Sequence, residues 1–298
     1  MEHDQPPVPV SSTLAAAGQQ GTAAEKDGPR DTATDTVPIS NRSSNPVPSG
    51  MNLAGVTVTS ATQDDVLARI DRAISQPGPA PLAIGSVNLD HLHHFPRGTG
   101  AQPGERPVDW LWLADGMPIA WRGRALSGQE WPRVTGADLL PAILAAAEHS
   151  RARVGWLGGT LHMHDELARV IAQRWPRLDA GSVWAPPREK LDAADCAEAI
   201  VQAIAGTQVD ILVVALGKPR QEQWIDSYGA LSGARVLLAF GASGDFLAGQ
   251  VPRAPEWMQK AGAEWLYRLY REPRRLARRY LIEGPQQFTL LRKASRIE

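Results

Sequence analysis

The sequence predicts an α/β protein built on a doubly wound, mostly parallel sheet of the Rossmann-like kind. Between residues 55 and 240, strand-like runs alternate with helix-like runs, which is typical of βαβ units. The run VDILVVAL at 209–216 is apolar without interruption, as expected of a strand that is buried on both faces. We therefore expect a parallel sheet with helices on both sides.

The predicted elements follow one another closely along the chain. Strands are expected at residues 55–59, 82–87, 110–113, 153–157, 178–183, 209–216 and 236–240. Thr62 suits an N-cap, so a helix is expected directly after it. Further helices are expected at 135–149, from 160 to 175, at 192–205 and from 221.

Composition divides the chain into three parts. Residues 1–50 contain no Phe, Trp or Tyr and are rich in Pro, Ser, Thr, Ala and Gln, which predicts a disordered N-terminal extension. Residues 51–250 form the predicted α/β core. Residues 251–298 are predicted to form a basic, aromatic, helical appendage, which closes the site and contacts membrane. Pro273 predicts a break between two helices there, since proline suits only the first turn of a helix.

The overall charge and the cysteine count exclude several classes of protein. The formal net charge of −1 argues against a protein-wide nucleic-acid surface. The single cysteine, Cys196, rules out an intramolecular disulfide and fits a reducing compartment. No apolar run approaches the ~20 residues of a membrane span, and no export signal pattern precedes the core. We expect a cytoplasmic protein, with any membrane contact peripheral.

The appendage carries a stripe of arginines. Arg268, Arg271, Arg275 and Arg278 follow a 3-4-3 spacing, which places them on approximately one helix face. Guanidinium groups gathered on one face suit a ligand with several anionic oxygens, such as a diphosphate. The alternative is a solvated cationic helix face, but the aromatics between the arginines favour a binding role.

Polar residues follow the predicted strands, where doubly wound sheets bind their ligands. They include Ser86 and Asn88 after one strand, Asp115 after the next, and Gln221 and Asp245 after the two apolar strands near the end. Asp245 is interpreted either as a nucleotide contact or as a residue that contacts the binding residues and not the nucleotide itself. The chain has no GxGxxG turn after its first strand and no P-loop, so a dinucleotide or P-loop site is disfavoured.

Several short motifs occur together in one order. They are S-V-N at 86–88, A-D-G at 114–116, R-V-T-G-A-D-L at 133–139, G-K-P-R-Q-E at 217–222, G-A-S-G-D-F-L-A-G at 241–249, R-A-P at 253–255 and E-W-L-Y-R-L at 264–269. On these motifs the chain resembles bacterial glycosyltransferases of the WecG/TagA/CpsF type, from about residue 52 to residue 280.

The resemblance implies an inverting, metal-independent transfer of a sugar from a UDP-sugar to a polyprenyl-diphosphate-linked saccharide. The sugar would be N-acetylmannosamine or glucose, and no cofactor is implied. By the same resemblance Asp115 is the general base, with Ser86 and Asn88 nearby. Substrate-binding roles fall on Arg133, Gln221, Arg268, Arg275 and Arg278. The chain departs from the family in having serine at position 86 and the segment PRGTGAQPGERP at 96–107.

Other interpretations make different predictions. A non-catalytic UDP-sugar-binding scaffold would not need the carboxylate of Asp115, and an epimerase or dehydrogenase would need the missing GxGxxG turn. His91, His93 and His94 resemble a metal cluster, but they have no carboxylates at ligand spacing, so we expect no zinc site. No D-x-D pair is present, so the arginines would stabilise the leaving diphosphate in place of a metal. A homo-oligomer is compatible with the sequence.

Overall fold

The computed structural model describes residues 49–94, 108–187, 194–250, 253–255, 257–258, 263–271, 273–277 and 284–297. Most of the predicted N-terminal extension and the segment at 96–107 lie outside this part of the chain. The first strand begins at Gly50, the last residue of the predicted extension, so the α/β core starts slightly earlier than the sequence suggested.

Within the described residues, the strands form one 9-stranded sheet. The strands are β1 (Gly50–Leu53), β2 (Val56–Thr59), β3 (Leu82–Val87), β4 (Asp109–Ala114), β5 (Val154–Gly158), β6 (Ser182–Trp184), β7 (Ile211–Ala215), β8 (Val236–Ala239) and β9 (Ser295–Ile297). The helices are α1 (Gln63–Ser75), α2 (Leu89–His94), α3 (Met117–Ser127), α4 (Gly136–Ser150), α5 (Leu161–Arg174), α6 (Ala194–Thr207), α7 (Arg220–Tyr228), the 3-10 turn η3 (Gly229–Leu231), α8 (Ser243–Leu247), α10 (Glu264–Arg271), α11 (Pro273–Ala277) and α12 (Gly284–Arg292).

The order of the strands places a topological switch in the middle of the sheet. The order is β6-β5-β7-β8-β3-β4-β2-β1-β9. On one side of the β8–β3 pair lie β7, β5 and β6, beyond β8. On the other side, beyond β3, lie β4, β2, β1 and β9. Pairing is parallel except where β1 meets β2 and β9. The predicted mostly parallel, doubly wound fold is confirmed, and a ligand site is expected beside this switch.

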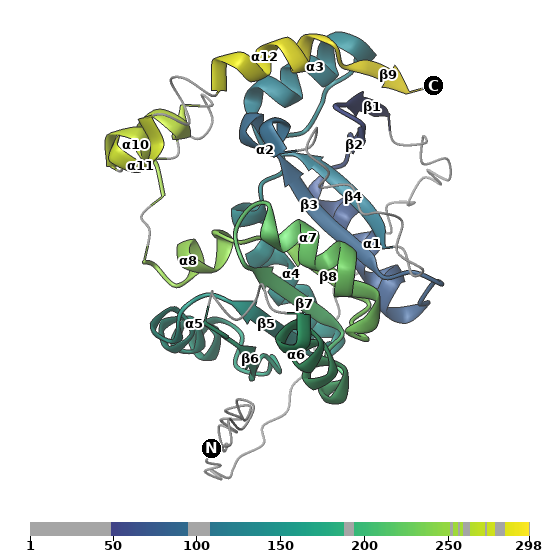
Figure 1. Cartoon of the computed structure of the whole chain (residues 1–298), viewed down its shortest axis with the longest axis vertical. Helices are drawn as coiled ribbons and strands as arrows, with labels where there is room; N and C mark the ends of the chain where they lie inside the picture. The colour runs from purple at the N-terminus through teal and green to yellow at the C-terminus, as the bar shows by residue number, and fades with distance from the viewer. Residues whose placement is uncertain are drawn as a thin grey trace, which may run out of the picture.

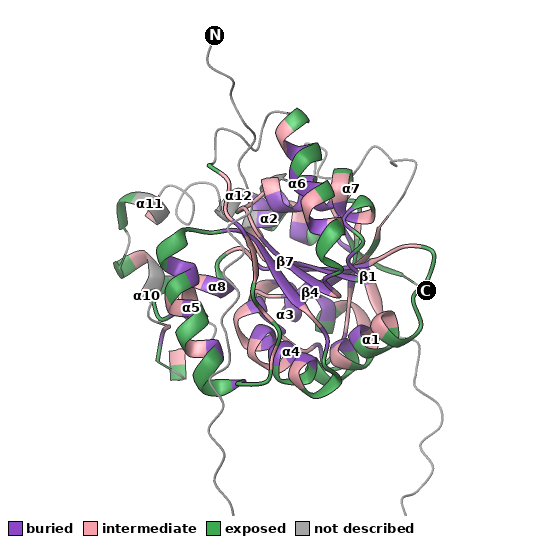
Figure 2. Cartoon of the chain, turned by 90° about the horizontal axis from the view of Figure 1, so that it is seen from below, coloured by how far each residue is buried: buried purple, intermediate pink, exposed green. Residues whose placement is uncertain are grey.

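Alternating side chains of the central strands pack into two hydrophobic cores, one on each face of the sheet. In β7, Ile211 and Val213 pack with α1, α4 and α5, whereas Leu212 and Val214 pack with α6 and α7. The same alternation occurs in β8, and it follows from the two-residue period of a strand. Figure 2 shows the buried sheet between two helical layers. The apolar run at 209–216 is thus explained, because both faces of β7 are covered.

Most predicted elements agree with the structure to within a few residues. Thr62 caps α1 as expected: its hydroxyl oxygen accepts from the Asp65 backbone N at 3.2 Å, and Asp65 accepts from the Thr62 N–H at 2.9 Å. The strand predicted at 178–183 begins later, at Ser182. The reason is a turn after α5, in which the Leu178 N–H donates to the Trp175 carbonyl at 3.0 Å.

The end of the chain returns to the sheet. β9 pairs antiparallel with β1, and α12 packs on α2 and α3 (Figure 1). The Arg122 guanidinium, on α3, donates to the Arg292 and Ala294 carbonyls, each at 2.8 Å. Residues 284–297 therefore complete the core, although the division at residue 250 assigned them to the appendage. The sequence could not show this, since every residue of β9 is exposed and carries no burial pattern.

Arg122→Ala should lower the free energy of unfolding by about 2 kcal/mol, because hydrogen bonds from a charged donor contribute ~1.5–3 kcal/mol. Urea denaturation measures this effect. Arg124→Ala, an exposed position on the same helix, is the matched control and should change stability by less than about 0.5 kcal/mol. Equal stability of the two variants would show that the Arg122 contacts do not hold the C-terminal elements in place.

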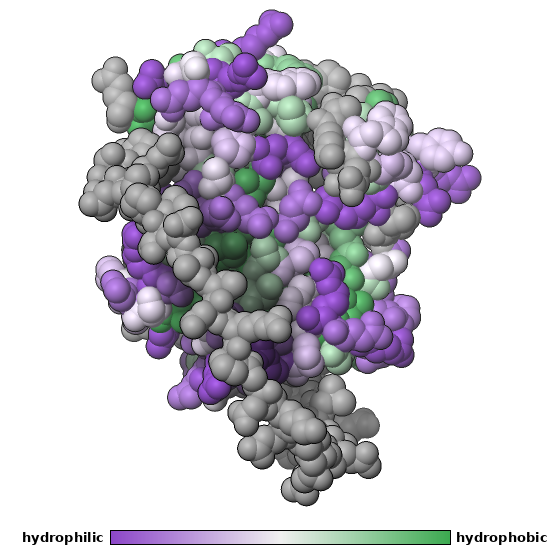
Figure 3. Space-filling model, turned by 180° about the vertical axis from the view of Figure 1, so that it is seen from behind, coloured by the Kyte–Doolittle hydropathy of each residue, from purple (hydrophilic) through white to green (hydrophobic). Residues whose placement is uncertain are grey.

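The described surface is largely polar with scattered apolar side chains. Figure 3 shows hydrophilic residues over most of the back of the molecule, with smaller hydrophobic patches around a shallow hollow. Around the two short helices α10 and α11, which stand off to one side of the sheet (Figures 1 and 2), Trp257, Leu266 and Tyr270 are exposed. In the described part of the chain, no helix has both the length and the apolar character needed to cross a bilayer.

Candidate active site

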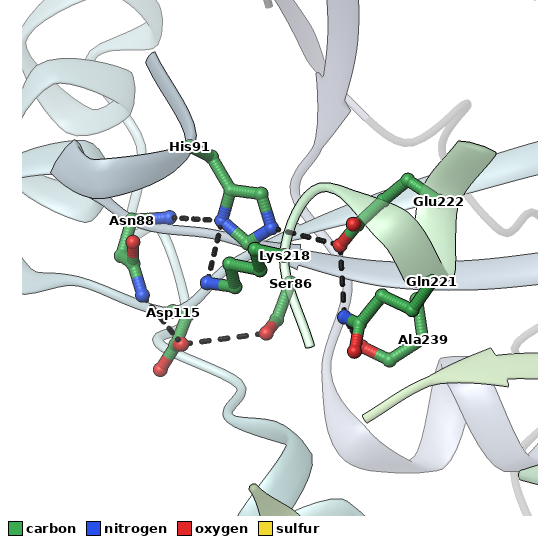
Figure 4. A network of polar contacts seen from close by, with 8 residues as sticks. All are labelled: Ser86, Asn88, His91, Asp115, Lys218, Gln221, Glu222 and Ala239. Atoms are coloured by element: carbon green, nitrogen blue, oxygen red, sulfur yellow. Dashed lines mark hydrogen bonds and ion pairs between the residues drawn. The ribbon is translucent and has the colours of Figure 1, made fainter. Parts of the chain in front are cut away.

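Polar side chains gather at the carboxyl ends of four adjacent parallel strands, β7, β8, β3 and β4, beside the topological switch. Figure 4 shows them converging from the end of β3, from the loops after β3, β4 and β7, and from the first turns of α2 and α7, with the Ala239 carbonyl at the end of β8. Because parallel strands end at the same edge of a sheet, motifs that are far apart in sequence come together here.

Asp115 lies at the centre of the first group of contacts. It follows β4 directly, and its N–H donates to the Val87 carbonyl of β3 at 2.9 Å. The Ser86 hydroxyl and the Asn88 side-chain amide each donate to Asp115 Oδ2 at 3.3 Å. These three predicted site residues are therefore brought together. Among the described residues, the contacts of this carboxylate go to Oδ2, which leaves Oδ1 available to accept a proton.

The register of β3 and β4 explains this arrangement. Val87 pairs with Ala114 at the ends of the two strands, so Asn88 and Asp115 both begin the loops that follow. Ser86 is buried near the end of β3, and Asp115 is half-buried. A serine at position 86 still supplies the hydroxyl donor, so this departure from the family does not remove the contact to Asp115.

A second group of contacts was not predicted from the sequence. His91 on α2 is buried, and its Nδ1 lies 3.3 Å from the Asn88 backbone N and 2.9 Å from Lys218 Nζ. Both partners are donors, so Nδ1 carries the lone pair and the ring proton is on Nε2. Nε2 faces Glu222 Oε1 of α7 at 3.2 Å. His91 thus links the Lys218 ammonium to the Glu222 carboxylate.

Gln221 lies at the end of this network. Its amide nitrogen donates to Glu222 Oε1 at 2.8 Å and to the Ala239 carbonyl at 2.9 Å, and the residue is only 1% exposed. The side chain of Gln221 passes so close to Gly241 that a Cβ there would lie 2.5 Å from Gln221 Oε1. The structure therefore ties Gln221 between β8 and α7, and a direct substrate contact by this side chain stays a prediction.

Arg133 is held in a cluster at the start of α4. Arg133 Nη2 lies 3.8 Å from Asp138 Oδ2, and the Thr135 hydroxyl donates to the same oxygen at 2.8 Å. Arg253, of the R-A-P motif, donates from Nη1 to Asp138 Oδ1 at 2.6 Å. The Val134 N–H donates to the Ala114 carbonyl at 2.8 Å, so the loop before α4 lies against the residue before Asp115. The substrate-binding role of Arg133 stays a prediction.

Burial raises the pKa of Asp138, but hydrogen bonds from Arg253 and Thr135 and the charges of Arg253 and Arg133 together hold it below its ordinary value of 3.8. A carboxyl with a depressed folded pKa stabilises the folded protein above its unfolded pKa, and this stabilisation is lost as the pH falls through the folded pKa. We expect the protein to be more stable than its Asp138→Asn variant near neutral pH, and this advantage to shrink below about pH 4.

Urea denaturation near neutral pH and below about pH 4 measures this difference in stability between the protein and its Asp138→Asn variant. Asp71→Asn on α1, where the carboxylate is exposed, is the control and should show no such dependence. An advantage over Asp138→Asn that is equally large at both pH values would contradict the role given to the two arginines.

Asp245 lies half-buried on α8, after β8. Its charge acts on His164 of α5, a buried residue whose Nε2 lies 2.7 Å from the Gly158 carbonyl. Burial lowers the pKa of His164 and outweighs the opposite effects of this hydrogen bond and of Asp165 and Asp245, so the ring is neutral near pH 7. The structure places Asp245 toward β5, and a nucleotide contact by Asp245 stays a prediction.

The remaining predicted residues are in the basic tail. Arg268 lies in α10 and Arg275 in α11, but their side chains are outside the described part of the structure, as is Arg278. The predicted closure of these arginines over a diphosphate therefore stays a prediction. The side chains of His93 and His94 also lie outside it, whereas His91 is engaged as described above. Among the described residues, no group of three His, Cys, Asp or Glu side chains is placed to hold a metal ion.

A carboxylate at the carboxyl edge of a doubly wound sheet, with hydroxyl and amide donors fixing one of its oxygens, is compatible with a general base that takes a proton from a hydroxyl. The model of the glycosyl transferase WecG/TagA/CpsF family matches residues 51–297. The chain belongs to this family and is a glycosyltransferase, which confirms the resemblance seen in the motifs.

Several curated relatives carry the name N-acetylglucosaminyldiphosphoundecaprenol N-acetyl-beta-D-mannosaminyltransferase. The protein from Bacillus spizizenii is 29% identical, with 62% of this chain and 68% of the relative aligned. That from Bacillus subtilis is 28% identical, over 56% of this chain and 62% of the relative. That from Staphylococcus aureus (strain MRSA252) is 27% identical, over 56% of this chain and 63% of the relative. The alignments thus span about two thirds of each relative.

Proposed function

We propose that the chain is an inverting glycosyltransferase that moves a sugar from a UDP-sugar to a polyprenyl-diphosphate-linked saccharide, in the synthesis of a cell-surface polysaccharide or exopolysaccharide. The observation that carries this proposal is the Asp115 carboxylate at the end of β4. Ser86 and Asn88 hold its Oδ2 at 3.3 Å each, and Oδ1, which no other described residue contacts, is proposed to act as the base. A protein that only binds a sugar nucleotide has no need of a base in this position.

The proposed step is a single displacement. Asp115 takes the proton of the acceptor hydroxyl, and the acceptor oxygen forms a bond to the anomeric carbon of the donor sugar. The bond from that carbon to the β-phosphate oxygen breaks, and its electron pair leaves with UDP. The attack comes from the side opposite the leaving oxygen, so the configuration at the anomeric carbon inverts. A positioned general base contributes ~10²–10⁴-fold to such a rate.

The negative charge that develops on UDP needs a counter-charge. The sequence lacks the D-x-D pair that commonly holds a metal for this purpose, and the tail between residues 265 and 281 carries six arginines. Fixed guanidinium groups aimed at the leaving phosphates stabilise the transition state electrostatically. We assign this role to Arg268, Arg275 and Arg278, so the proposed reaction needs no divalent cation.

The substrate classes follow from the family. The names of the relatives specify transfer of N-acetylmannosamine to an undecaprenyl-diphosphate-linked N-acetylglucosamine. For this chain the proposed donor sugar is N-acetylmannosamine or glucose, and the proposed acceptor is a saccharide on a polyprenyl diphosphate.

A lipid-linked acceptor places the site at a membrane surface. The side chains of Trp257, and of Leu266 and Tyr270 on α10, are exposed by 67%, 46% and 83%. Arg271 on α10 and Arg274 on α11 are exposed as well. Aromatic and basic side chains together favour an anionic lipid surface. We propose that this segment docks on the inner face of the plasma membrane, where it meets the acceptor.

The release of UDP from a UDP-sugar, with and without a lipid-diphosphate saccharide, tests the proposed function. A transferase releases UDP in proportion to the acceptor that it glycosylates. A sugar-nucleotide-binding scaffold binds the donor and releases no UDP, and an epimerase converts the donor without releasing UDP. Either of these last two results overturns the proposal. A panel of UDP-sugars in the same assay identifies the donor.

Turnover should also persist in excess chelator, since arginines and not a divalent cation stabilise the leaving group in the proposed reaction. We expect the rate with EDTA to stay within about twofold of the rate without it, whereas a metal-assisted transfer loses several kcal/mol of transition-state stabilisation. Complete loss of activity that magnesium or manganese restores would contradict the assignment of this role to the tail.

A further inference from the structure

The ammonium of Lys218 lies close to the residues that hold Asp115. Its Nζ lies 2.9 Å from His91 Nδ1, and the Asn88 backbone N–H donates to the same nitrogen at 3.3 Å. The side-chain amide of Asn88 donates in turn to Asp115. Two residues, His91 and Asn88, therefore link the Lys218 ammonium to the proposed base, and Figure 4 shows the ammonium directed toward this group.

The position of the ammonium is fixed by buried partners. His91 and Glu222 are 3% and 1% exposed, and their contact of 3.2 Å fixes the ring proton on Nε2. The lone pair of Nδ1 then has to face the site, where it accepts from Lys218. A lysine alone is a flexible point charge, but a buried acceptor restricts where this ammonium can rest. Lys218 itself is half-buried, so its side chain is not fully enclosed by the protein.

The lysine reaches the site from a strand that is not adjacent to the one that carries the base. Asp115 follows β4 and Lys218 follows β7, and the ends of β8 and β3 lie between these two strands. The side chain of Lys218 extends to His91, whose partner Asn88 also holds Asp115. The same edge of the sheet therefore carries both the proposed base, for the acceptor, and a cation, for the leaving group.

The surroundings of Lys218 also favour an anionic ligand. α7 begins at Arg220, two residues later, and no side chain caps its first turn. The N-terminus of a helix attracts negative charge, and here it adds to the lysine ammonium. The segment GKPRQE, which follows β7, contributes both the lysine and the start of the helix. The proposed reaction so far gives Lys218 no role.

We infer that Lys218 is a donor-binding residue that contacts the terminal phosphate of the UDP leaving group, and that His91 is a positioning residue that holds its ammonium there. This inference rests on the proposed function, since it presumes a UDP-sugar donor. It divides the stabilisation of the leaving group between a cation in the core and the arginines of the tail.

The test compares the affinities of UDP and UMP, because only UDP carries the terminal phosphate. Lys218→Met removes the charge and keeps the length of the side chain. By titration calorimetry we expect the preference for UDP over UMP to fall about tenfold or more, as for the loss of one charge-assisted hydrogen bond, while UMP affinity changes by less than about twofold. Retained UMP binding also shows that the variant is folded.

Two matched variants complete the design. Lys218→Arg keeps a cation and should keep most of the preference. Lys293→Met makes the same substitution at an exposed position after α12 and should leave both affinities unchanged. A preference that is unchanged in Lys218→Met, or an equal loss for UDP and UMP, overturns the assignment of Lys218 and leaves the proposed function standing. If the unsubstituted protein binds neither nucleotide, the proposed UDP-sugar donor is wrong and the assignment falls with it.

Discussion

Asp115→Asn should lower turnover by about 10²–10⁴-fold, which is the usual contribution of a general base. Asparagine keeps the size and polarity of the side chain, so it can remain beside Ser86 and Asn88, but its amide cannot take the proton of the acceptor hydroxyl. Binding of UDP should change by less than about twofold, because the proposed base acts on the acceptor and not on the nucleotide. Steady-state UDP release and calorimetry measure the two effects separately.

Asp109→Asn is the matched control for this substitution. Asp109 is exposed at the opposite end of the same strand, β4, so the exchange alters the same kind of group far from the carboxyl edge. Turnover of this variant should equal that of the unsubstituted protein. If Asp115→Asn retains more than about half of the turnover, Asp115 is not the base and another group must take the proton.

Replacing Arg268, Arg275 and Arg278 together with alanine should weaken UDP binding by about 100-fold or more. Each charge-assisted hydrogen bond to a phosphate is worth ~1.5–3 kcal/mol, and every 1.4 kcal/mol is a factor of ten in affinity. Calorimetry without lipid measures this effect, so that loss of membrane binding cannot be mistaken for loss of nucleotide binding. Turnover should fall as well, because the leaving group loses its counter-charge.

Arg274→Ala is the control for the tail, since Arg274 is exposed on α11 and lies outside the predicted set. Truncation of the chain after Gly249 would also remove α12 and the edge strand β9. Excision of residues 264–283, with a flexible linker in their place, keeps α12, β9 and the contact of Arg253 with Asp138, and removes the segment that carries α10 and α11. Unchanged UDP affinity in the triple variant would mean that the arginines form a solvated basic face.

The sheet could be predicted because its central strands are buried on both faces. The unbroken apolar runs of β7 and β8 identify such strands without any knowledge of their neighbours. The strand β1 and the edge strand β9 are four and three residues long, and their pairing joins the two ends of the described chain. A contact of that kind leaves no local pattern in the sequence, so the C-terminal elements were assigned to the appendage.

The group of residues around Asp115 could also be predicted from the sequence. Ser86, Asn88 and Asp115 lie at the ends of two strands that pair in parallel, so a correct strand assignment places them together. The link from His91 to Lys218 and Glu222 joins residues 127 and 131 positions apart, across α2 and α7. Glu222 and Lys218 stand in the recognisable G-K-P-R-Q-E segment, but His91 was considered only as a metal ligand. The spacing of His91 from Asn88, three residues at the start of a helix, was the available signal.

The anomeric configuration of the product tests the central claim most directly. NMR of the saccharide formed from an α-linked UDP-sugar reports whether the new bond is α or β. Attack by an acceptor hydroxyl that Asp115 deprotonates, on the side opposite the leaving UDP, predicts a β linkage. A product that retains the α configuration would contradict the single displacement and the role of Asp115 in it.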